Sequence, residues 1–497
     1  MPAKGGGDGV ARASRLVLLL AWYVAGTGFA APVRQPPAPL NLLLITADDL
    51  NADSAGWMGS RMPATRRLDA LARSSHRLVN AHLTASICAP SRAALLTGRV
   101  PHRNGVLGFG PVAADVPTLV EVLQAQGYFA AAINKLSHMR PATKFHWDLA
   151  LHGSGRHPAA FGADVARCLD EARRAGRPFF VDANITDPHR PFLGSDLDRW
   201  PPGNGRLARA VVHAWALRAG PALVPGILED LPPIRRELTR YYASVARMDQ
   251  SLRAALDALE AAGHAGDTVI VFLSDNGMSV PFAKATVYRD GTWSPVVLRY
   301  PGMPPATAHE AMVSSVDLMP TVLELLDVAP PAGMDGRSWV PLLRGEAQDG
   351  RDHVVTHVNT VRSGAAFPQR CARTATRSLI FEPWADGRRR FRVEAMNGLT
   401  FPALEAAARH DPAIDARVRQ YVFGTVLALY DLERDPDERR DVIDAPAYRP
   451  DLEHLERLLL AHMERTGDPL LGAFRAAIAA RERAPPAELT VGPTGTA

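Results

Sequence analysis

Four long apolar runs constrain the fold of this chain more than any other feature of its sequence. They read LNLLLITADD, YFAAAINKLSH, PFFVDANITDPH and DTVIVFLSDNG, and they span residues 40–49, 128–138, 178–189 and 267–277. Each run is apolar at nearly every position rather than at every second one. This pattern is typical of strands that are buried on both faces, as in a parallel sheet.

Segments with helical periodicity lie between the four runs. They are residues 65–78, 117–127 and 235–263. In the second of them Pro117 suits a first helical turn and Gly127 suits a helix end. Strands that alternate with helices favour an α/β, doubly wound fold.

Every apolar run ends on polar residues, and these are the candidate site. They are Asp48 and Asp49, then Lys135 and His138, then His189, and finally Asp275 and Asn276. Ligands of doubly wound proteins bind beyond the carboxyl ends of the strands, so we expect one shared site. The alternative is that each polar cluster only begins a loop.

The acidic clusters among these residues have the chemistry of a cation site. Carboxylate and amide oxygens suit Ca²⁺ or Mg²⁺ better than Zn²⁺. Adjacent aspartates such as Asp48 and Asp49 repel each other strongly unless a cation lies between them. Helix capping in the following loop is the alternative role for such residues.

The segment CAPSRAALLTGR, residues 88–99, has the pattern of a helix beginning. Pro90 suits its first turn and Gly98 its end, which places Cys88 at the positive end of the helix dipole. Arg92 lies one turn further on and can face the same anion. Cys88 is therefore either a nucleophile beside an anion site or a buried structural cysteine.

The first 30 residues have the pattern of a secretory signal peptide. Arg12 and Arg15 precede the apolar run LVLLLAWYVAGTGFA, which ends in small residues. The run is shorter than a membrane span, although an uncleaved anchor is the alternative. We expect an exported protein, periplasmic or secreted, with no stable membrane span after cleavage. Residues 31–39 are expected to be a flexible linker.

The cysteine count and the charge carry two further expectations. The chain has three cysteines, Cys88, Cys168 and Cys371, so one is left over in an exported protein. Cys168 and Cys371 could pair, but their spacing does not decide this. The formal net charge is +4, and no basic stripe is interleaved with aromatic residues, so nucleic-acid binding is not expected.

The pattern changes after about residue 350. We expect a catalytic domain over 40–350, a smaller α+β subdomain over 351–481 and a disordered tail over 482–497. Short strands are predicted at HVVTHV, RSLIFEP, RFRVEAM and LALYD, followed by a helix over 450–465. The stretch 196–234 is rich in proline and glycine and is expected to be an insertion over the site.

The segment CAPSRAALLTGR resembles the signature C-x-P-S-R-x-x-x-L-T-G of the type I sulfatases. The order of the other motifs is similar, and LYDLERDPDERRDV resembles a late segment of that family. Within the family, the segment over 245–298 is most similar to the heparan N-sulfatases, or sulfamidases. The resemblance implies an alkaline-phosphatase-like sandwich with a large mixed, mostly parallel central sheet flanked by helices. It also implies a smaller C-terminal subdomain with a short antiparallel sheet.

The resemblance also implies the chemistry. Cys88 would be converted to formylglycine, which hydrates to a geminal diol. One diol oxygen would attack the sulfur of a sulfate ester or sulfamate, and the second hydroxyl would then expel sulfate. The implied substrate is a sulfated glycan such as N-sulfoglucosamine. The implied partner is a formylglycine-generating maturation enzyme, and a homodimer is one assembly open to the protein.

The roles that the resemblance implies can be carried over by residue. Asp48, Asp49, Asp275 and Asn276 would hold one Ca²⁺ together with modified Cys88. Arg92, Lys135, His138 and Lys284 would contact the diol or the sulfuryl oxygens, His189 would protonate the leaving group, and Arg370 would contact substrate.

The chain departs from the family pattern at three places. The spacing from Lys135 to His138 is longer than in sulfamidases. Thr186 stands where the family's H-x-P-H motif has its first histidine, and Lys284 replaces an arginine. Two other hydrolases remain open: a phosphonate or phosphate-ester hydrolase on the same scaffold, and an aryl- or O-sulfatase with another substrate. A catalytically silent carbohydrate-binding relative is a further alternative.

Overall fold

The structure is a computed structural model that describes residues 39–195 and 205–483. The expected signal peptide, most of the linker and most of the tail lie outside these residues. No helix in the described part of the chain is long and apolar enough to cross a membrane. The two sheets described below belong to one unit of the chain that begins at Pro39.

The larger sheet has eight strands. Neighbouring strands run parallel except for β7, which is antiparallel to both β6 and β2. In spatial order they are β4 (Leu149–Leu151), β3 (Phe129–Ile133), β5 (Phe179–Pro188), β1 (Asn41–Asp48), β6 (Thr268–Ser274), β7 (Val296–Arg299), β2 (His76–His82) and β8 (Ala308–Ser314).

Strand β1 shows why the four runs are apolar at successive positions. Leu43 and Ile45 pack into one hydrophobic core, and Leu42 and Leu44 pack into a second core on the opposite face of the sheet. Burial of both faces favours apolar side chains along most of the strand, and its two polar exceptions before the end, Asn41 and Thr46, are buried and hydrogen-bonded. The four predicted strands are confirmed as β1, β3, β5 and β6.

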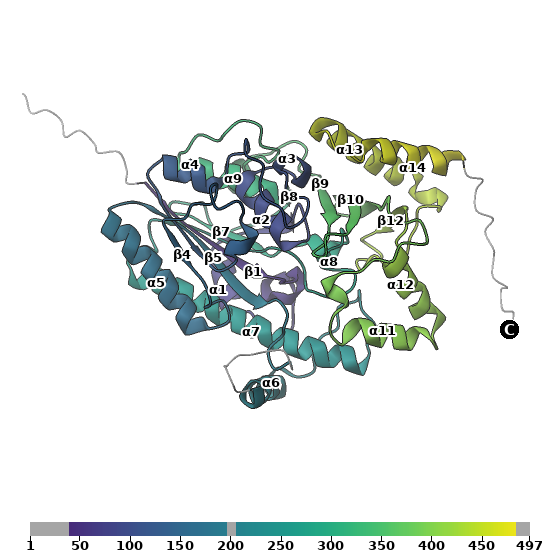
Figure 1. Ribbon diagram of the computed structural model, residues 1–497, viewed down its shortest axis with the longest axis horizontal. Helices are drawn as coiled ribbons and strands as arrows, with labels where there is room; N and C mark the ends of the chain where they lie inside the picture. Colours follow the sequence, from purple (N-terminus) through teal and green to yellow (C-terminus); the bar gives the residue numbers. More distant parts are fainter. Residues whose placement is uncertain (1–38, 196–204, 484–497) are drawn as a thin grey trace, which may run out of the picture. The chain divides into compact units, whose positions relative to one another are not determined.

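Helices cover both faces of the sheet (Figure 1). The first core holds residues of α1 (Arg66–Arg73), α5 (Pro158–Ala175) and α7 (Pro232–Ala261). The second core holds residues of α2 (Cys88–Thr97), α4 (Leu119–Ala125) and α9 (Leu318–Leu325). The remaining helices of this part are α3 (Pro101–Asn104), α6 (Gly205–Ala219), α8 (Arg289–Thr292) and α10 (Val340–Leu343).

The smaller sheet is antiparallel and has four strands. A third core lies between this sheet and helices α13 and α14. Together the two sheets confirm the predicted fold class. The elements of this part are β9 (His353–Thr360), β10 (Ala366–Thr374), β11 (Arg377–Phe381), α11 (Thr400–Ala408), α12 (Pro412–Phe423), β12 (Leu427–Asp431), α13 (Arg449–Thr466) and α14 (Leu471–Arg483).

Three local predictions differ from the structure. The helix expected over 65–78 stops at Arg73, because the hydroxyls of Ser74 and Ser75 donate to the carbonyl of Leu71 (3.1 and 2.7 Å) and compete with the helix hydrogen bonds. The strand expected at RFRVEAM is absent, and Glu394–Met396 forms a 3₁₀ turn there. The stretch 196–234 contains helix α6, while residues 196–204 lie outside the described part.

Candidate active site

The ends of four neighbouring strands bring the predicted site residues together. Strands β3, β5, β1 and β6 are adjacent and parallel, so their carboxyl ends open at one edge of the sheet. Ala47 pairs in register with Ser274, which places the Asp48–Asp49 pair beside Asp275. Residues that are more than 200 positions apart in the chain therefore meet because of the strand order.

The acidic residues at the ends of β1 and β6 form a fully buried cluster. The chain turns sharply after β1, where Asp49 has φ of 70°. The amide N–H of Asp49 donates to Asp275 Oδ1 (3.2 Å), and Asn276 Nδ2 donates to Asp49 Oδ1 (2.5 Å). These bonds hold Asp49 beside Asp275 and Asn276, and Asp48 is the preceding residue of the same strand end.

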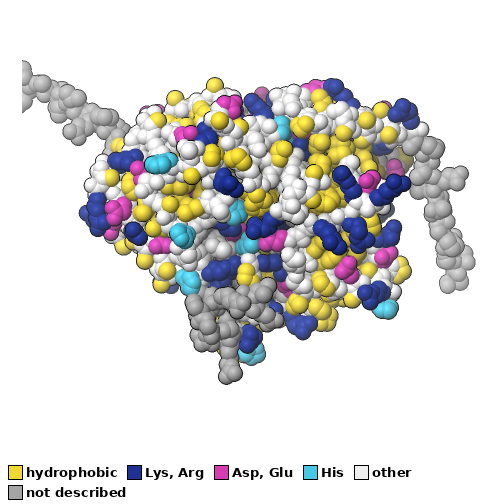
Figure 2. Space-filling model, viewed as in Figure 1, with side chains coloured by type: hydrophobic (Ala, Val, Ile, Leu, Met, Phe, Trp, Pro, Cys, Tyr) yellow, Lys and Arg dark blue, Asp and Glu magenta, His cyan; other side chains and the backbone are white. Residues whose placement is uncertain are grey.

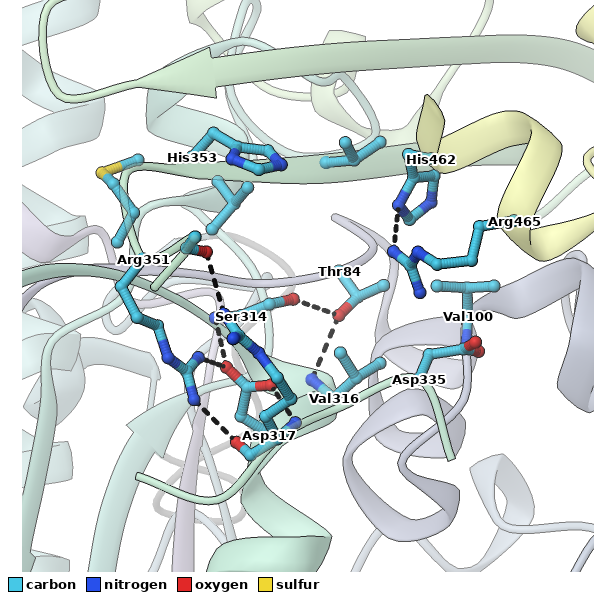
Figure 3. Close-up of a pocket in the computed structure, with 15 residues that line it drawn as sticks. Thr84, Val100, Ser314, Val316, Asp317, Asp335, Arg351, His353, His462 and Arg465 are labelled. Carbon is cyan, nitrogen blue, oxygen red and sulfur yellow. Dashed lines mark hydrogen bonds and ion pairs between the residues drawn. The ribbon is translucent and has the colours of Figure 1, made fainter. Parts of the chain in front are cut away.

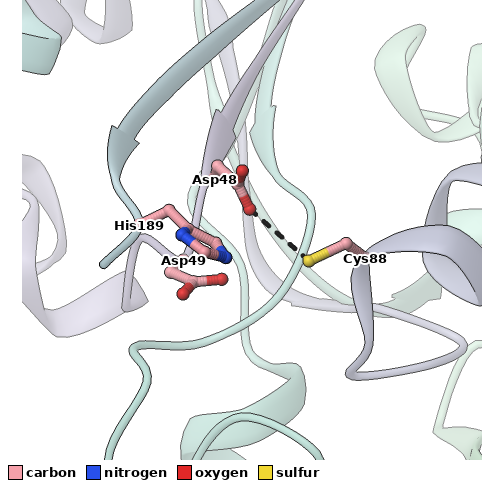
Figure 4. A group of neighbouring side chains, drawn as sticks. All are labelled: Asp48, Asp49, Cys88 and His189. Atoms are coloured by element: carbon pink, nitrogen blue, oxygen red, sulfur yellow. Dashed lines mark hydrogen bonds between the residues drawn. The ribbon is translucent and has the colours of Figure 1, made fainter. Parts of the chain in front are cut away.

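Helix α2 carries Cys88 to this cluster. Ile87 is extended, Pro90 lies in the first turn, and Gly98 ends the helix with φ of 63°, as the sequence predicted. All ten residues of the helix are buried. The thiol of Cys88 donates to Asp48 Oδ1 at 3.5 Å (Figure 4). Burial raises the pKa of this thiol well above its usual value, so the thiol stays protonated at neutral pH.

Arg92 lies one turn along α2 from Cys88 and is held from several sides. Its Nη1 donates to Thr46 Oγ1 (2.9 Å) and to Asn184 Oδ1. Its Nη2 lies 2.8 Å from Asp275 Oδ2. The guanidinium is buried, and its orientation is fixed by neighbours on β1, β5 and the end of β6.

Two lysines bring further positive charge to the carboxyl groups. Lys135 follows β3 in a left-handed conformation (φ of 53°) and forms an ion pair with Asp48. Lys284 Nζ lies 2.7 Å from Asp49 Oδ1. With Arg92, three cations face three carboxylates, so the buried charges are balanced.

His189 lies at the edge of the cluster and is partly exposed, at 21 %. Its Nδ1 donates to the carbonyl of Arg190, because a carbonyl oxygen can only accept. Its Nε2 lies 3.3 Å from Glu394 Oε1, and Glu394 Oε2 lies 3.7 Å from Lys284 Nζ. Glu394 was not among the predicted site residues, because the segment around it was expected to be a strand of the smaller sheet.

The pKa values show how closely the carboxyl groups are crowded. Burial raises the pKa of Asp49 to about 7, and burial with the nearby charge of Asp48 raises that of Asp275 to about 6. Burial also raises the pKa of Asp48, but the charges of Lys135 and His189 outweigh it and hold that pKa well below its usual value. An additional cation would favour the charged form of all three groups.

The donor atoms of the cluster fit a hard cation. The Oδ1 atom of Asn276 is buried and accepts no hydrogen bond from any described residue. Ligand atoms of Asp48, Asp49, Cys88 and His189 all lie within 4.8 Å of one another (Figure 4). Carboxylate and amide oxygens are the ligands that Ca²⁺ and Mg²⁺ prefer. The cluster could therefore hold such an ion.

Two other predicted site residues have different surroundings. His138 lies in the 3₁₀ turn Leu136–His138 that follows Lys135. Burial and the charge of Lys135 lower its pKa to about 3, so it is neutral beside the cluster. Arg370 is not brought to the cluster. It is fully buried on β10, Nε and Nη2 lie 2.6 and 3.0 Å from the carboxylate of Asp468, and Nη1 donates to two backbone carbonyls. These bonds disfavour the predicted contact with substrate.

All three cysteines are buried free thiols. Cys168 lies on α5 and Cys371 on β10, and they do not form a disulfide. A disulfide between the other two cysteines therefore does not account for the unpaired Cys88.

A separate pocket lies between β8, β9 and α13 and contains none of the predicted site residues (Figure 3). Its polar groups bind one another. Arg351 pairs with Asp317, Ser314 lies 2.9 Å from Thr84, and Arg465 donates to His462 (3.2 Å). The buried cluster at the strand ends is therefore the better candidate for the active site.

Comparison with known proteins identifies the family of the chain. The sulfatase family matches residues 40–328. N-sulphoglucosamine sulphohydrolase from Homo sapiens is 30% identical over 469 residues, covering 87% of this chain and 91% of the relative. Among solved structures, the protein BT4656 in complex with its substrate D-glucosamine-2-N,6-O-disulfate has a TM-score of 0.66 at 19% identity, covering 87% of this chain and 99% of that one.

A phosphonate monoester hydrolase from Silicibacter pomeroyi also has this fold. Its TM-score is 0.61 at 19% identity, covering 87% of this chain and 96% of that one. The family match covers more than half of the chain, and the human relative is matched over most of its length. The protein therefore belongs to the sulfatase family and is a hydrolase of sulfate esters or sulfamates.

Proposed function

We propose that this enzyme removes the sulfuryl group from a sulfated glycan, with formylglycine made from Cys88 as the nucleophile and one Ca²⁺ in the carboxylate cluster. One observation carries the proposal. A buried thiol at the start of a helix lies against Asp48, among three carboxylates and three cations. A thiol with a raised pKa is a weak nucleophile there, which favours a modified residue.

The two groups that the family implies each have a place among these residues. Converted to formylglycine by a maturation enzyme and hydrated, residue 88 would supply an oxygen nucleophile. Asp48, Asp49, Asp275 and Asn276 would hold Ca²⁺, which would supply positive charge beside that oxygen. The orphaned Oδ1 of Asn276 supports this assignment.

The fixed cations of the chain are suited to bind the sulfuryl oxygens. Arg92, Lys135 and Lys284 come from three different elements and surround the carboxylates. Because their positions are set before substrate arrives, they can stabilise developing negative charge without reorganisation. Figure 2 shows basic, acidic and histidine side chains gathered near the middle of the face in view.

His189 is suited to protonate the leaving group. Its Nδ1 is bound to the carbonyl of Arg190, so only Nε2 can exchange a proton with a substrate. Nε2 faces Glu394 at 3.3 Å on the partly exposed side of the site. Burial and the charge of Lys284 lower the pKa of His189 to about 4, so the resting ring is neutral with its proton on Nδ1. Nε2 would therefore take up a proton from solvent on this partly exposed side, next to Glu394, and pass it to the leaving oxygen or nitrogen.

The comparisons favour an N-sulfated glucosamine as substrate. The human relative is named for N-sulphoglucosamine, and the solved structure BT4656 holds a glucosamine 2-N,6-O-disulfate. An exported enzyme would meet such glycans outside the cytoplasm, and the signal-like pattern of the first 30 residues supports export. Sulfamate and sulfate ester differ only in the leaving atom, so the same cations serve both.

A phosphonate or phosphate ester is the second candidate substrate. The fold is shared with a phosphonate monoester hydrolase, and a tetrahedral phosphoryl group would meet the same cations. Relative activity on matched aryl sulfate and aryl phosphonate esters separates the two candidates. A preference for the phosphonate would contradict the sulfatase proposal.

The proposal is tested at residue 88. Mass spectrometry of the peptide that contains Cys88, from protein made in its own host, is expected to show the mass of formylglycine rather than that of cysteine. Cys88→Ala is expected to abolish sulfate release while the circular dichroism spectrum and the melting temperature stay close to those of the unsubstituted protein. An unmodified thiol in active enzyme, or full activity of the variant, would contradict it.

A further inference from the structure

Phe109 and Arg362 form a rim beside the active site that the proposed function does not use. The ring of Phe109 meets the imidazole of His138 edge-on, with centroids 5.6 Å apart. The guanidinium carbon of Arg362 lies 5.4 Å from the centroid of the same ring. Burial raises the pKa of Glu394, which lies beside His189, but the charge of Lys284 and, less strongly, that of Arg362 help to lower it. The rim therefore borders the side where the leaving group would lie.

The backbone holds this rim in place. The amide of Thr360 donates to the carbonyl of Leu107 (3.0 Å), which ties the two segments together. Gly108 permits this close approach, since a Cβ atom there would lie 3.1 Å from Thr360 Cβ. Arg362 lies in the tight turn between β9 and β10, where Val361 N donates to Ala365 O (3.0 Å). Two segments more than 200 residues apart thus present one surface.

Arg362 differs from the other cations near the site. Arg92 and Lys284 are buried, Lys135 is largely shielded, and all three are paired with carboxylates. Arg362 is exposed, and no described residue forms an ion pair or a hydrogen bond with it. Its contact with the Phe109 ring lies on the face of the guanidinium and leaves the N–H donors at its edge free. A guanidinium with free donors binds a carboxylate or sulfate through two parallel hydrogen bonds.

We propose that Phe109 and Arg362 form a second anion subsite, which binds a carboxylate or sulfate group on the sugar next to the one that loses its sulfuryl group. The inference rests on the proposed function, because it places the leaving group on the side of His189 and Glu394. Sulfated glycans carry an anionic group on most of their sugars, so such a group is available one sugar away. The subsite makes the enzyme prefer a charged disaccharide over a sulfated monosaccharide.

The test compares four substrates on the mature enzyme, of which three address the carboxylate. They are N-sulfoglucosamine, a disaccharide in which N-sulfoglucosamine is linked to a hexuronate, and the methyl ester of that disaccharide, which lacks the second charge. A fourth, the methyl ester with a sulfate on its second sugar, separates a sulfate from a carboxylate as ligand. Wild-type enzyme is expected to show a higher kcat/KM on the two charged disaccharides than on the methyl ester.

Arg362→Ala is expected to lower the ratio of kcat/KM on the uronate disaccharide to that on the methyl ester about tenfold, chiefly through KM. Arg362→Lys keeps the charge without the paired donors, and its ratio is expected to lie between those of wild type and Arg362→Ala. Arg174→Ala is the matched control, because Arg174 is an exposed arginine on α5 that pairs with Glu171. A ratio in Arg362→Ala equal to that of wild type would overturn the subsite.

Binding separates failure of the subsite from failure of the proposed function. In a Cys88→Ala background, which needs no turnover, Arg362→Ala is expected to weaken calorimetric affinity for the uronate disaccharide about tenfold and to leave the methyl ester unaffected. If this holds but wild-type enzyme hydrolyses none of the sulfated sugars, the proposed function is wrong and the subsite stands. If Arg362→Ala leaves the affinity for the uronate disaccharide unchanged in this background, the subsite is overturned, whatever the activity of the wild-type enzyme.

Discussion

Asn184 sets the position of the arginine that faces Cys88. Its Oδ1 accepts from Arg92 and from Thr46 Oγ1 (2.6 Å), and its Nδ2 donates to the carbonyls of Ile133 and Asp182 (3.1 Å each). The residue is fully buried on β5. Asn184 was not among the predicted site residues, because one amide inside an apolar strand carries no local signal of what it will face.

Asn184→Ala is expected to harm both catalysis and stability. It removes the acceptor of one Arg92 N–H and of the Thr46 hydroxyl, and the bonds to the carbonyls of Ile133 and Asp182, which lowers the free energy of unfolding by about 2–3 kcal/mol. The displaced Arg92 is expected to lower kcat/KM about 10–100-fold. Urea melts and steady-state kinetics measure the two effects. Asn80→Ala is the control, because Asn80 makes one exposed hydrogen bond to the backbone. Wild-type kinetics in Asn184→Ala would show that Arg92 does not depend on it.

Two further residues show what local sequence cannot reveal. Arg370 was expected to contact substrate, but Asp468, 98 positions away, takes its guanidinium in a buried pair. Glu394 was hidden in a segment expected to form a strand, and it lies beside His189 and Lys284 instead. In both cases the decisive contact joins residues that are far apart in the chain, where no periodicity links them.

At the scale of elements, Glu237 ties helix α7 to the start of α11. Its carboxylate accepts from the amides of Leu399 and Thr400 (3.0 and 2.8 Å), from the Thr400 hydroxyl (2.6 Å) and from Arg190 (2.5 Å). Burial raises the pKa of Glu237, but the bonds from Arg190 and Thr400 outweigh it and hold that pKa below its usual value. The ionised form is therefore favoured more in the folded protein than in the unfolded one.

The sign of this shift predicts an acid-dependent stability. A carboxyl group with a lowered folded pKa stabilises the protein above its unfolded pKa of about 4.5, and this stabilisation is lost as the pH falls below that value. Glu237→Gln is expected to lower the free energy of unfolding by about 2 kcal/mol at pH 7. The difference from wild type should shrink between pH 5 and pH 3. Urea melts at several pH values measure this difference in the free energy of unfolding. Glu405→Gln is the control, because Glu405 is exposed. A difference that does not change with pH would contradict this role.

The strands differ in how far the sequence predicts them. Strands β1, β3, β5 and β6 are buried on both faces, and their apolar runs identified them. Strand β4 has three residues that are not buried, and the first half of β8 alternates between exposed and half-buried positions. Such strands form because they pair with the backbone of a neighbouring strand. Their own residues lack the apolar pattern that identifies a buried strand.

At the scale of the whole molecule, the fold was predictable and the complete site was not. The order β3, β5, β1, β6 places four predicted strand ends side by side, so the cluster of Asp48, Asp49 and Asp275 followed from the runs. The side proposed to face the leaving group is built from later segments. Glu394 and Arg362 reach it only because the smaller sheet packs beside the larger one.

Calcium is expected to stabilise the entire folded chain, because its proposed ligands come from two strand ends and exist as a site only after folding. An ion that binds the folded state alone, at 100 times its Kd, adds about 2.7 kcal/mol. Chelation of a calcium-loaded preparation should therefore lower the melting temperature by several degrees, and added Ca²⁺ should restore it. Asp275→Asn is expected to melt at a lower temperature than wild type and to lose this response, because it removes one ligand charge and the partner of Arg92. A wild-type melting temperature that is the same with chelator and with Ca²⁺ would mean that Lys135, Lys284 and Arg92 alone neutralise the carboxylates.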